Sequence, residues 1–320
     1  MTLAIDFTLP AFAQAYAAGV SPRAVVAEFF RRVAAVNDPA IFISLRSEAE
    51  LLAAVDALPP RDPARQPLWG VLCAVKDNID VAGTATTAAC AASSVTPTRS
   101  ARVVELLEAA GAIIVGKTNL DQFATGLVGV RSPYGVPRNA FDATRVPGGS
   151  SSGSAVAVAQ GLVAFSLGTD TAGSGRVPAG LNDLVGLKPS LGALSTRGVL
   201  PACRTLDCVS VFATTVSDAF AVYEVLRGFD AEDAYSRPVV ADKPGDTAPL
   251  RRLGVPCAGD RLFFGDSAMA SAYEAALAKL GSDVTLVEID MTPFFDVARL
   301  LYEGPWVAER HAVVKDLMAA

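Results

Sequence analysis

Histidine and paired cysteines are scarce in this chain of 320 residues. His311 is the single histidine, which excludes a site built from several histidines and leaves one imidazole for a Ser-His-Asp arrangement. The five cysteines are odd in number and contain no C-x-x-C pair, so the sequence predicts neither a disulfide framework nor a zinc site. We therefore expect reduced thiols, a cytoplasmic location, and no metal or organic cofactor. A redox pair formed by Cys203 and Cys208 is the alternative.

An excess of positive charge is also missing. The chain has 27 Lys and Arg against 33 Asp and Glu, which gives a net charge of -6. The sequence therefore does not predict the clustered basic surface that nucleic-acid binding requires. Residues 1–20 contain Asp6 and lack Lys or Arg, unlike a secretory signal. The uncharged stretch between Arg145 and Asp170 offers only about 13 mainly apolar residues, where a membrane span needs ~20. We expect a buried element there and no membrane partner.

The apolar fraction of 51 % is large enough for an extended core. Helical patterns alternate with short apolar runs, which favours an α/β fold. In the first half we expect helices at 9–35 (split near Gly19, with Ser21 as a cap before Pro22), 100–110 (capped by Ser100) and 151–160. We expect strands there at 68–75, 112–115 and 162–167. In the second half we expect helices at 216–227, 268–280 and 293–319, strands beginning at 254 and 284, and a linker at 229–249.

Two clusters of glycine and serine carry the main chemical signal. They are Gly-Gly-Ser-Ser-Ser-Gly-Ser at 148–154 and Gly-Thr-Asp-Thr-Ala-Gly-Ser-Gly-Arg at 168–176. A serine nucleophile needs an accessible hydroxyl, a base, and bare backbone N–H groups for the oxyanion, and such clusters supply the first and the last. The sequence therefore points to an acyl-transfer hydrolase. Its base could be His311, a carboxylate or a lysine, and Lys76 ends an apolar run before the turn-forming Asp77-Asn78.

These motifs together resemble the amidase signature family. The resemblance rests on Gly70 to Asn78, Gly116 to Asn119, 148–154 and Gly168 to Pro189, and it covers most of residues 65–215. The separations of 74 residues from Lys76 to Ser150 and 24 from Ser150 to Ser174 agree with the family's spacing.

By this resemblance the fold would be a large, mixed, twisted β-sheet with helices on both faces. Ser174 would be the nucleophile, Ser150, in a cis peptide, the proton relay, and Lys76 the base. The backbone N–H groups of Thr171, Ala172, Gly173 and Ser174 would form the oxyanion hole. Lys76 must then be neutral, which requires a pKa lowered from about 10.4 toward ~7 to 8. Asp170 and Arg176 would brace the loop.

Three further stretches resemble allophanate hydrolases: Leu301 to Arg310, Thr125 to Gly129, and Cys203 to Cys208. This resemblance implies that Tyr302, Arg310 and Gly126 bind the substrate, with Tyr302 and Arg310 holding the carboxylate of allophanate. The expected reaction is hydrolysis of allophanate with release of ammonia through an acyl-enzyme. The alternatives are an amidase for another small amide and a non-catalytic amidase-like subunit.

Other readings of the same residues remain open. Gly149 to Gly153 fits the G-x-S-x-G nucleophile elbow, which would make Ser151 the nucleophile with His311 as base and Asp283 or Asp290 as the acid. The serines could also simply cap a helix. Lys117 and Lys188 are alternative bases.

For the domain organisation, we expect one amidase-signature domain over residues 1–320. It would comprise N-terminal helices at 1–60, a catalytic core at 65–215 and a substrate-pocket segment at 250–320, without the C-terminal part of the usual fold. The expected partner is a small-molecule amide, and the high apolar fraction is consistent with a homodimer.

Overall fold

The computed structural model describes residues 5–238, 249, 251–280 and 284–319. The chain packs as two compact units, one formed by Met1–Val239 with Arg310–Ala320 and the other by Val240–Glu309. The expectation of a single domain over residues 1–320 stays a prediction. The boundary falls inside the linker that the sequence predicts at 229–249.

The larger unit is built on a six-stranded mixed sheet with the order β1-β3-β2-β4-β6-β5. The central strands β3, β2 and β4 are parallel, and β1, β6 and β5 join antiparallel to their neighbours. The mixed α/β fold is therefore confirmed. The strands are β1 (Phe42–Leu45), β2 (Leu72–Lys76), β3 (Ile113–Thr118), β4 (Phe165–Asp170), β5 (Val185–Leu187) and β6 (Cys208–Ala213).

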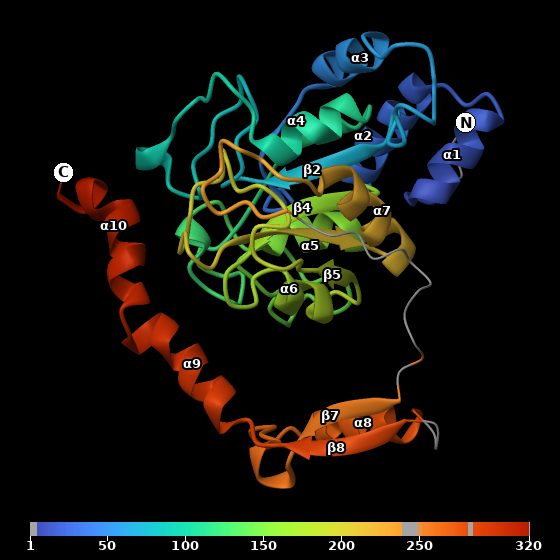
Figure 1. Ribbon diagram of the computed structural model, residues 1–320. Coiled ribbons are helices and arrows are strands. Elements are labelled where there is room, and N and C mark those ends of the chain that lie inside the picture. Colours follow the sequence, from blue (N-terminus) through green and yellow to red (C-terminus); the bar gives the residue numbers. More distant parts are fainter. Residues whose placement is uncertain (1–4, 239–248, 250, 281–283, 320) are drawn as a thin grey trace. The chain divides into compact units, whose positions relative to one another are not determined.

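Helices cover both faces of this sheet. The connection from β2 to β3 runs through α4 (Arg102–Ala109), and the connection from β3 back across β2 to β4 runs through α5 (Ser152–Ala159). Because parallel crossovers are right-handed, these two helices lie on opposite faces (Figure 1). The other helices of this unit are α1 (Leu9–Ala17), α2 (Pro22–Val36), α3 (Glu48–Asp56), α6 (Arg176–Leu181) and α7 (Val216–Leu226), with single 3₁₀ turns η1 (Ala91–Ser93) and η2 (Gln122–Ala124).

Two serines expected to cap helices behave differently. Ser21 accepts a hydrogen bond from the Arg23 N–H at 3.2 Å and caps α2, as predicted. The prediction for Ser100 is wrong, because α4 begins at Arg102 and its cap position, Ala101, offers no side-chain oxygen. The Ser100 hydroxyl instead accepts a hydrogen bond from the Ala82 N–H at 3.0 Å.

Helix α5 runs through the interior of the larger unit. Seven of its residues, Ser152 through Val158, are buried, and the helix packs against β2, β3, β4 and β6. Its sequence is therefore small or apolar on every side, as expected for a helix without a solvent face. The Ser154 hydroxyl donates to the Leu167 carbonyl at 2.9 Å and lies 2.7 Å from the Thr118 hydroxyl, which fixes the start of the helix between β3 and β4.

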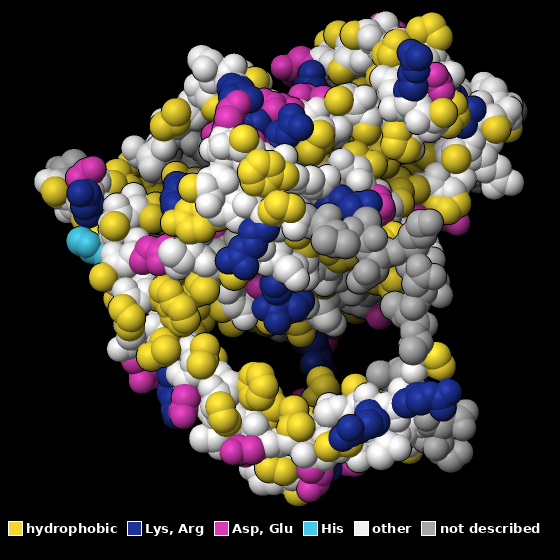
Figure 2. Space-filling view, viewed as in Figure 1, with side chains coloured by type: hydrophobic (Ala, Val, Ile, Leu, Met, Phe, Trp, Pro, Cys, Tyr) yellow, Lys and Arg dark blue, Asp and Glu magenta, His cyan; other side chains and the backbone are white. Residues whose placement is uncertain are grey.

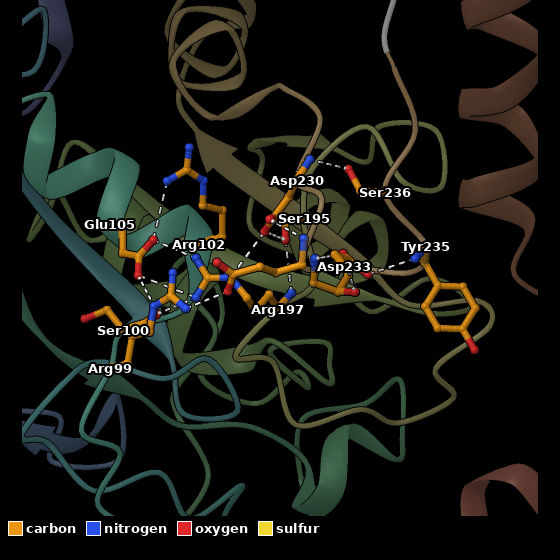
Figure 3. A network of polar contacts seen from close by, with 12 residues as sticks. Arg99, Ser100, Arg102, Glu105, Ser195, Arg197, Asp230, Asp233, Tyr235 and Ser236 are labelled. Atoms are coloured by element: carbon orange, nitrogen blue, oxygen red, sulfur yellow. Dashed lines mark hydrogen bonds and ion pairs between the residues drawn. The ribbon is translucent and has the colours of Figure 1, made fainter.

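The first part of the predicted linker is fastened to the core by a polar network (Figure 3). The Asp230 carboxylate accepts hydrogen bonds from the Ser195 hydroxyl at 2.7 Å and from Arg197 Nε at 3.3 Å. Arg197 also donates to Glu105 on α4 at 2.6 Å, and the Thr196 N–H donates to Asp233 at 2.7 Å. Residues 239–248 of the same predicted linker lie outside the described residues.

The smaller unit contains a parallel strand–helix–strand motif. Its elements are β7 (Arg252–Pro256), η3 (Ala258–Asp260), α8 (Ser267–Ala278), β8 (Thr285–Ile289) and α9 (Thr292–Glu303), and β7 pairs with β8. Exposed apolar side chains, among them Phe294 and Val297, gather along α9 (Figure 2). A final helix, α10, spans Trp306–Ala319. Within the described parts of the chain, every helix is too short or too polar to cross a bilayer.

The three parallel strands bring their carboxyl ends to one edge of the sheet. The last residues of these strands are Lys76 in β2, Thr118 in β3 and Asp170 in β4. In α/β sheets this edge is where ligands bind. The loops that follow β3 and β4 carry the two glycine and serine clusters, so the fold assembles the chemical motifs at this edge.

Candidate active site

Lys76 lies at the centre of the site. Its side chain is fully buried, and its Nζ lies 2.8 Å from Ser150 Oγ and 2.8 Å from Thr169 Oγ1. Ser150 is equally buried. Two of the three residues predicted for catalysis, separated by 74 positions in the chain, are thus in direct hydrogen-bond contact.

The environment of the Lys76 amine favours its neutral form. Burial lowers its pKa from the ordinary value of 10.5 to about 7, although Asp121, Asp207 and Asp170 exert a Coulombic effect in the opposite direction. A large share of the molecules then carries an unprotonated amine near neutral pH. Such an amine can accept a proton from Ser150.

The backbone around Ser150 is hydrogen-bonded to two residues of the loop that follows β3. The Gly149–Ser150 peptide bond is cis, as the resemblance implies. The Ser150 carbonyl accepts the Asp121 N–H at 3.0 Å, and the Gly149 N–H donates to the Leu127 carbonyl at 2.9 Å.

Ser174 follows β4 and lies close to the first serine cluster. Its carbonyl accepts the Ser151 N–H at 3.3 Å, which joins the two clusters through their backbones. Its hydroxyl donates to the Gly126 carbonyl at 3.4 Å. The structure therefore brings Gly126, one of the residues predicted to bind substrate, to the predicted nucleophile.

Thr169 and Asn78 belong to this site, and the sequence analysis missed them. Thr169 Oγ1 accepts hydrogen bonds from Lys76 Nζ and from Asn78 Nδ2, the latter at 3.3 Å. Asn78 Nδ2 also donates to the Leu200 carbonyl at 3.1 Å. By accepting an N–H of Lys76, Thr169 fixes the position of the amine beside Ser150.

The segment 171–174, predicted to form the oxyanion hole, lies between β4 and α6. The buried Asp170 carboxylate accepts the backbone N–H groups of Gly175 at 3.1 Å and Arg176 at 3.2 Å, and both Nε and Nη2 of Arg176. Burial raises the pKa of Asp170, but the hydrogen bonds and positive charge of Arg176, together with the Gly175 N–H, outweigh burial and hold the pKa below its ordinary value. Asp170 and Arg176 thus brace this loop.

A second carboxylate holds the other side of the same loop. Asp207 accepts a hydrogen bond from the Thr171 hydroxyl, and its Oδ2 accepts the Ala202 N–H at 2.9 Å. Burial raises the pKa of Asp207, and the hydrogen bond from Thr171 opposes that rise. The hydrogen bonds just described to Asp170 and Asp207 do not involve the backbone N–H groups of 171–174, whose role as an oxyanion hole stays a prediction.

The alternative lysines have other partners. Lys117 and Asp77 form an ion pair of 3.0 Å between two fully buried side chains, and Lys117 Nζ also donates to Thr86 Oγ1 at 2.9 Å. Lys188 donates to the Pro189 carbonyl at 2.6 Å. Neither lysine is hydrogen-bonded to Ser150 or Ser174 in the described structure.

The nucleophile-elbow alternative lacks its structural context. Ser151 is fully buried, and its hydroxyl donates to the Thr169 carbonyl at 3.1 Å. Within the described segment 119–151, no strand leads into Ser151, whereas an elbow requires a strand, a turn and a helix. Asp290 is exposed and accepts the Thr292 N–H at 2.9 Å, His311 is exposed on α10, and Asp283 lies outside the described residues.

The remaining residues predicted to bind substrate lie in the C-terminal helices. Tyr302 is on α9 and has 56 % of its side chain exposed, and Arg310 is half-buried on α10. Their contact with a substrate stays a prediction. Cys208, which the alternative redox pair would require, is a free thiol in the described structure.

A mixed sheet that places a buried lysine against one serine, with a second serine on the loop beside it, is the arrangement that the resemblance to the amidase signature family implies. The chain belongs to the amidase family, whose model matches residues 24–320. The resemblance inferred from the motifs is therefore confirmed.

Comparison with individual proteins places the chain more specifically within this family. Urea amidolyase of Saccharomyces cerevisiae is 48 % identical over 280 residues, which are 87 % of this chain and 15 % of that protein. The structure of Kluyveromyces lactis allophanate hydrolase superposes with a TM-score of 0.91 and 43 % identity, covering 98 % of this chain and 52 % of that one. One component of the glutamyl-tRNA(Gln) amidotransferase of Symbiobacterium thermophilum is 44 % identical over 236 residues, 71 % of this chain and 48 % of that protein. The chain is thus an allophanate-hydrolase-like member of the family that spans about half or less of each of these relatives.

Proposed function

We propose that this chain hydrolyses allophanate, a small urea-like carboxylate, and releases ammonia through an acyl-enzyme on Ser174. The observation that carries the proposal is the 2.8 Å contact between Ser150 Oγ and a buried Lys76 amine whose pKa is about 7. The similarity to urea amidolyase and allophanate hydrolase supports the choice of substrate.

In the proposed reaction a proton moves along the three side chains. The neutral Nζ of Lys76 takes the proton of Ser150 Oγ, which takes the proton of Ser174 Oγ. Ser174 Oγ then bonds to the terminal carbonyl carbon, the C–N bond breaks, and the leaving nitrogen receives the proton and departs as ammonia. Water cleaves the acyl-enzyme by the same proton path, and the N-carboxycarbamate released loses carbon dioxide without help.

The negative charge that develops on the carbonyl oxygen would be stabilised by the loop 171–174. Its backbone N–H groups are held in place from two sides, by the pair of Asp170 and Arg176 and by Asp207. Fixed donors of this kind are worth about 10²- to 10³-fold in rate each. The loop contributes through its rigidity, because donors that are already oriented need no rearrangement during the reaction.

The carboxylate of allophanate would be bound by Tyr302 and Arg310, with Gly126 beside the reacting carbonyl. A guanidinium binds a carboxylate through two parallel hydrogen bonds, and a phenol adds a neutral donor. Hydrolysis of a different small amide is the second candidate, favoured by the identity to the amidotransferase component. It would use the same serines and lysine without Arg310.

Ammonia release from allophanate, biuret, malonamide and acetamide tests these candidates. We expect allophanate to be the best substrate, Ser174→Ala to be inactive, and Arg310→Ala to raise KM for allophanate at least about tenfold without affecting acetamide. Equal turnover of allophanate and acetamide, or an unchanged KM in Arg310→Ala, would reject the substrate. A folded protein that turns over none of the four amides would be a non-catalytic member of the family.

A further inference from the structure

Asp121 closes the loop that follows β3. Its carboxylate is fully buried, Oδ1 accepts the Arg131 N–H at 2.8 Å, and Oδ2 accepts the Gly129 N–H at 3.0 Å. These two bonds fold residues 121–131 back on themselves. The folded loop presents the Gly126 carbonyl that accepts the hydroxyl of Ser174.

The same residue also contacts the segment that carries Ser150. The Asp121 N–H donates to the Ser150 carbonyl at 3.0 Å. Its carboxylate packs so closely on two glycines that a Cβ would come within 2.1 Å of Oδ2 at Gly149 and within 2.6 Å at Gly126. Only glycine fits at these two positions while Asp121 is present. The carboxylate and the backbone N–H of one buried residue therefore join the backbones on either side of the predicted proton path.

The charges that act on Lys76 come from several elements. Asp170 ends β4, Asp207 precedes β6, and Asp121 follows β3, while the buried ion pair of Lys117 and Asp77 is neutral as a whole. Burial lowers the pKa of Lys76, and the three carboxylates oppose it, Asp121 most strongly. Removing the negative charge of Asp121 should therefore make the amine less basic still.

We propose that Asp121 is a positioning residue of this site, which holds the backbones of Ser150 and Gly126 around Ser174 and supplies a negative charge that acts on the amine of Lys76. The inference rests on the proposed function, in which Ser150 passes a proton to Lys76. It adds a group that touches neither the substrate nor the reacting atoms. Its two contributions, to geometry and to charge, predict separate effects on the rate.

The experiment compares Asp121→Asn and Asp121→Ser with the wild-type chain between about pH 5.5 and pH 9, the range in which the base titrates. Two rates are measured, kcat/KM for ammonia release and the modification of Ser174 by a fluorophosphonate, followed by intact mass. In the second reaction the Ser174 oxygen bonds to phosphorus, fluoride leaves, and the serine proton passes through Ser150 to Lys76. This reaction requires the proton path but no knowledge of the amide substrate.

Both variants should lower the plateau rate by about 10- to 100-fold, because misplaced reacting groups lose rate on this scale. Both should also move the acidic limb of the pH profile to lower pH, by about half a unit to one unit, since both lack the charge. Asp218→Asn is the matched control, because it removes another buried carboxylate that caps a backbone N–H, on α7, and it should leave the limb in place.

The inference is overturned if the folded Asp121 variants keep the acidic limb of the pH profile at its wild-type pH. It is also overturned if they keep the wild-type plateau rate. If neither variant folds, Asp121 acts only on folding and the inference is likewise rejected. Wild-type protein that reacts with the fluorophosphonate but cleaves no amide would contradict the proposed function, while the shift of the limb in the labelling reaction would still decide the role of Asp121.

Discussion

Replacing Lys76 by methionine should make the protein inactive and, near neutral pH, more stable. The substitution keeps the unbranched stem and removes a fully buried amine. In the folded chain the pKa of this amine is about 7, against an ordinary value of 10.5. Because the unfolded chain binds the proton more tightly, the wild-type protein loses stability as the pH falls from about 10.5 to about 7.

The size of the effect follows from this difference in pKa. At pH 7 the lowered pKa of Lys76 costs the wild-type protein about 4 kcal/mol of unfolding free energy. Methionine removes this cost but leaves the hydroxyls of Ser150 and Thr169 without the amine, at about 1 kcal/mol each. We therefore expect Lys76→Met to be about 2 kcal/mol more stable at pH 7. Its advantage should shrink by about 2.5 kcal/mol between about pH 6.5 and pH 9.

Urea unfolding of the full chain at these two pH values, followed by fluorescence and circular dichroism, measures the change. Ser150→Ala serves as the control, because it loses a hydroxyl but keeps the amine and should retain the wild-type dependence on pH. The decisive quantity is the difference in unfolding free energy between Lys76→Met and the wild type. If this difference changes by less than about 0.5 kcal/mol between pH 6.5 and pH 9, the argument that the buried amine is neutral in the folded protein is refuted.

Further expectations concern the same site and its surroundings. The kcat/KM of the wild type should rise as the pH increases through about 7, because only the unprotonated Lys76 accepts a proton; a rate that is flat from pH 5.5 to pH 8 would contradict this role. Thr169→Val should lower kcat about 10- to 100-fold with little change in KM, and wild-type kinetics would show that the hydroxyl does not orient the amine. Gly149→Ala, whose Cβ would lie 2.1 Å from Asp121 Oδ2, should lose at least about 3 kcal/mol of stability, and an unchanged urea midpoint would contradict that contact. Arg197→Met should lower the free energy of unfolding by about 2 to 3 kcal/mol, since the buried Asp230 carboxylate in Figure 3 loses its ion pair with the Arg197 guanidinium; thermal unfolding at the wild-type temperature would disprove this.

Local patterns in the sequence predict much of the fold. The helices α1, α2, α7 and α8 lie where their apolar periodicity and caps indicate, because these signals depend on neighbouring residues. The apolar run at 68–75 likewise ends in a strand whose last residue is Lys76. Helix α3 is not among the expected helices, although Ser47 and Glu50 form a capping box there, which is a signal present in the sequence.

Strands β1, β5 and β6 could not be predicted in the same way. The whole of β6 is buried and pairs with β4, about forty positions earlier in the chain. Strand β1 has only four residues, each half-buried. The formation of such strands depends on distant partners, which a single sequence does not name.

In the site, too, some residues can be recognised from the local sequence and others depend on distant partners. The glycine and serine clusters and Lys76 stand out because their residue types are unusual in a row. Thr169 is an ordinary strand residue, and its contact with Lys76 arises from the register of β2 against β4. The one signal in the sequence that could have identified Thr169 as a site residue is its position between Gly168 and Asp170, on a strand whose side chains alternate between the two faces. The partners of Asp121 and Asp207 likewise depend on how the loops fold.

The buried helix α5 has a consequence for how this enzyme family can vary. A Cβ on Gly153 would lie 2.2 Å from the Ile41 carbonyl oxygen, and its neighbours from Ser152 to Val158 have no exposed face on which a larger side chain could project. Natural or engineered changes of substrate preference should therefore be sought in the exposed parts of the loops around the site, such as Val128 and Val130, where a new side chain has room. Libraries that randomise α5 should yield mostly unfolded protein.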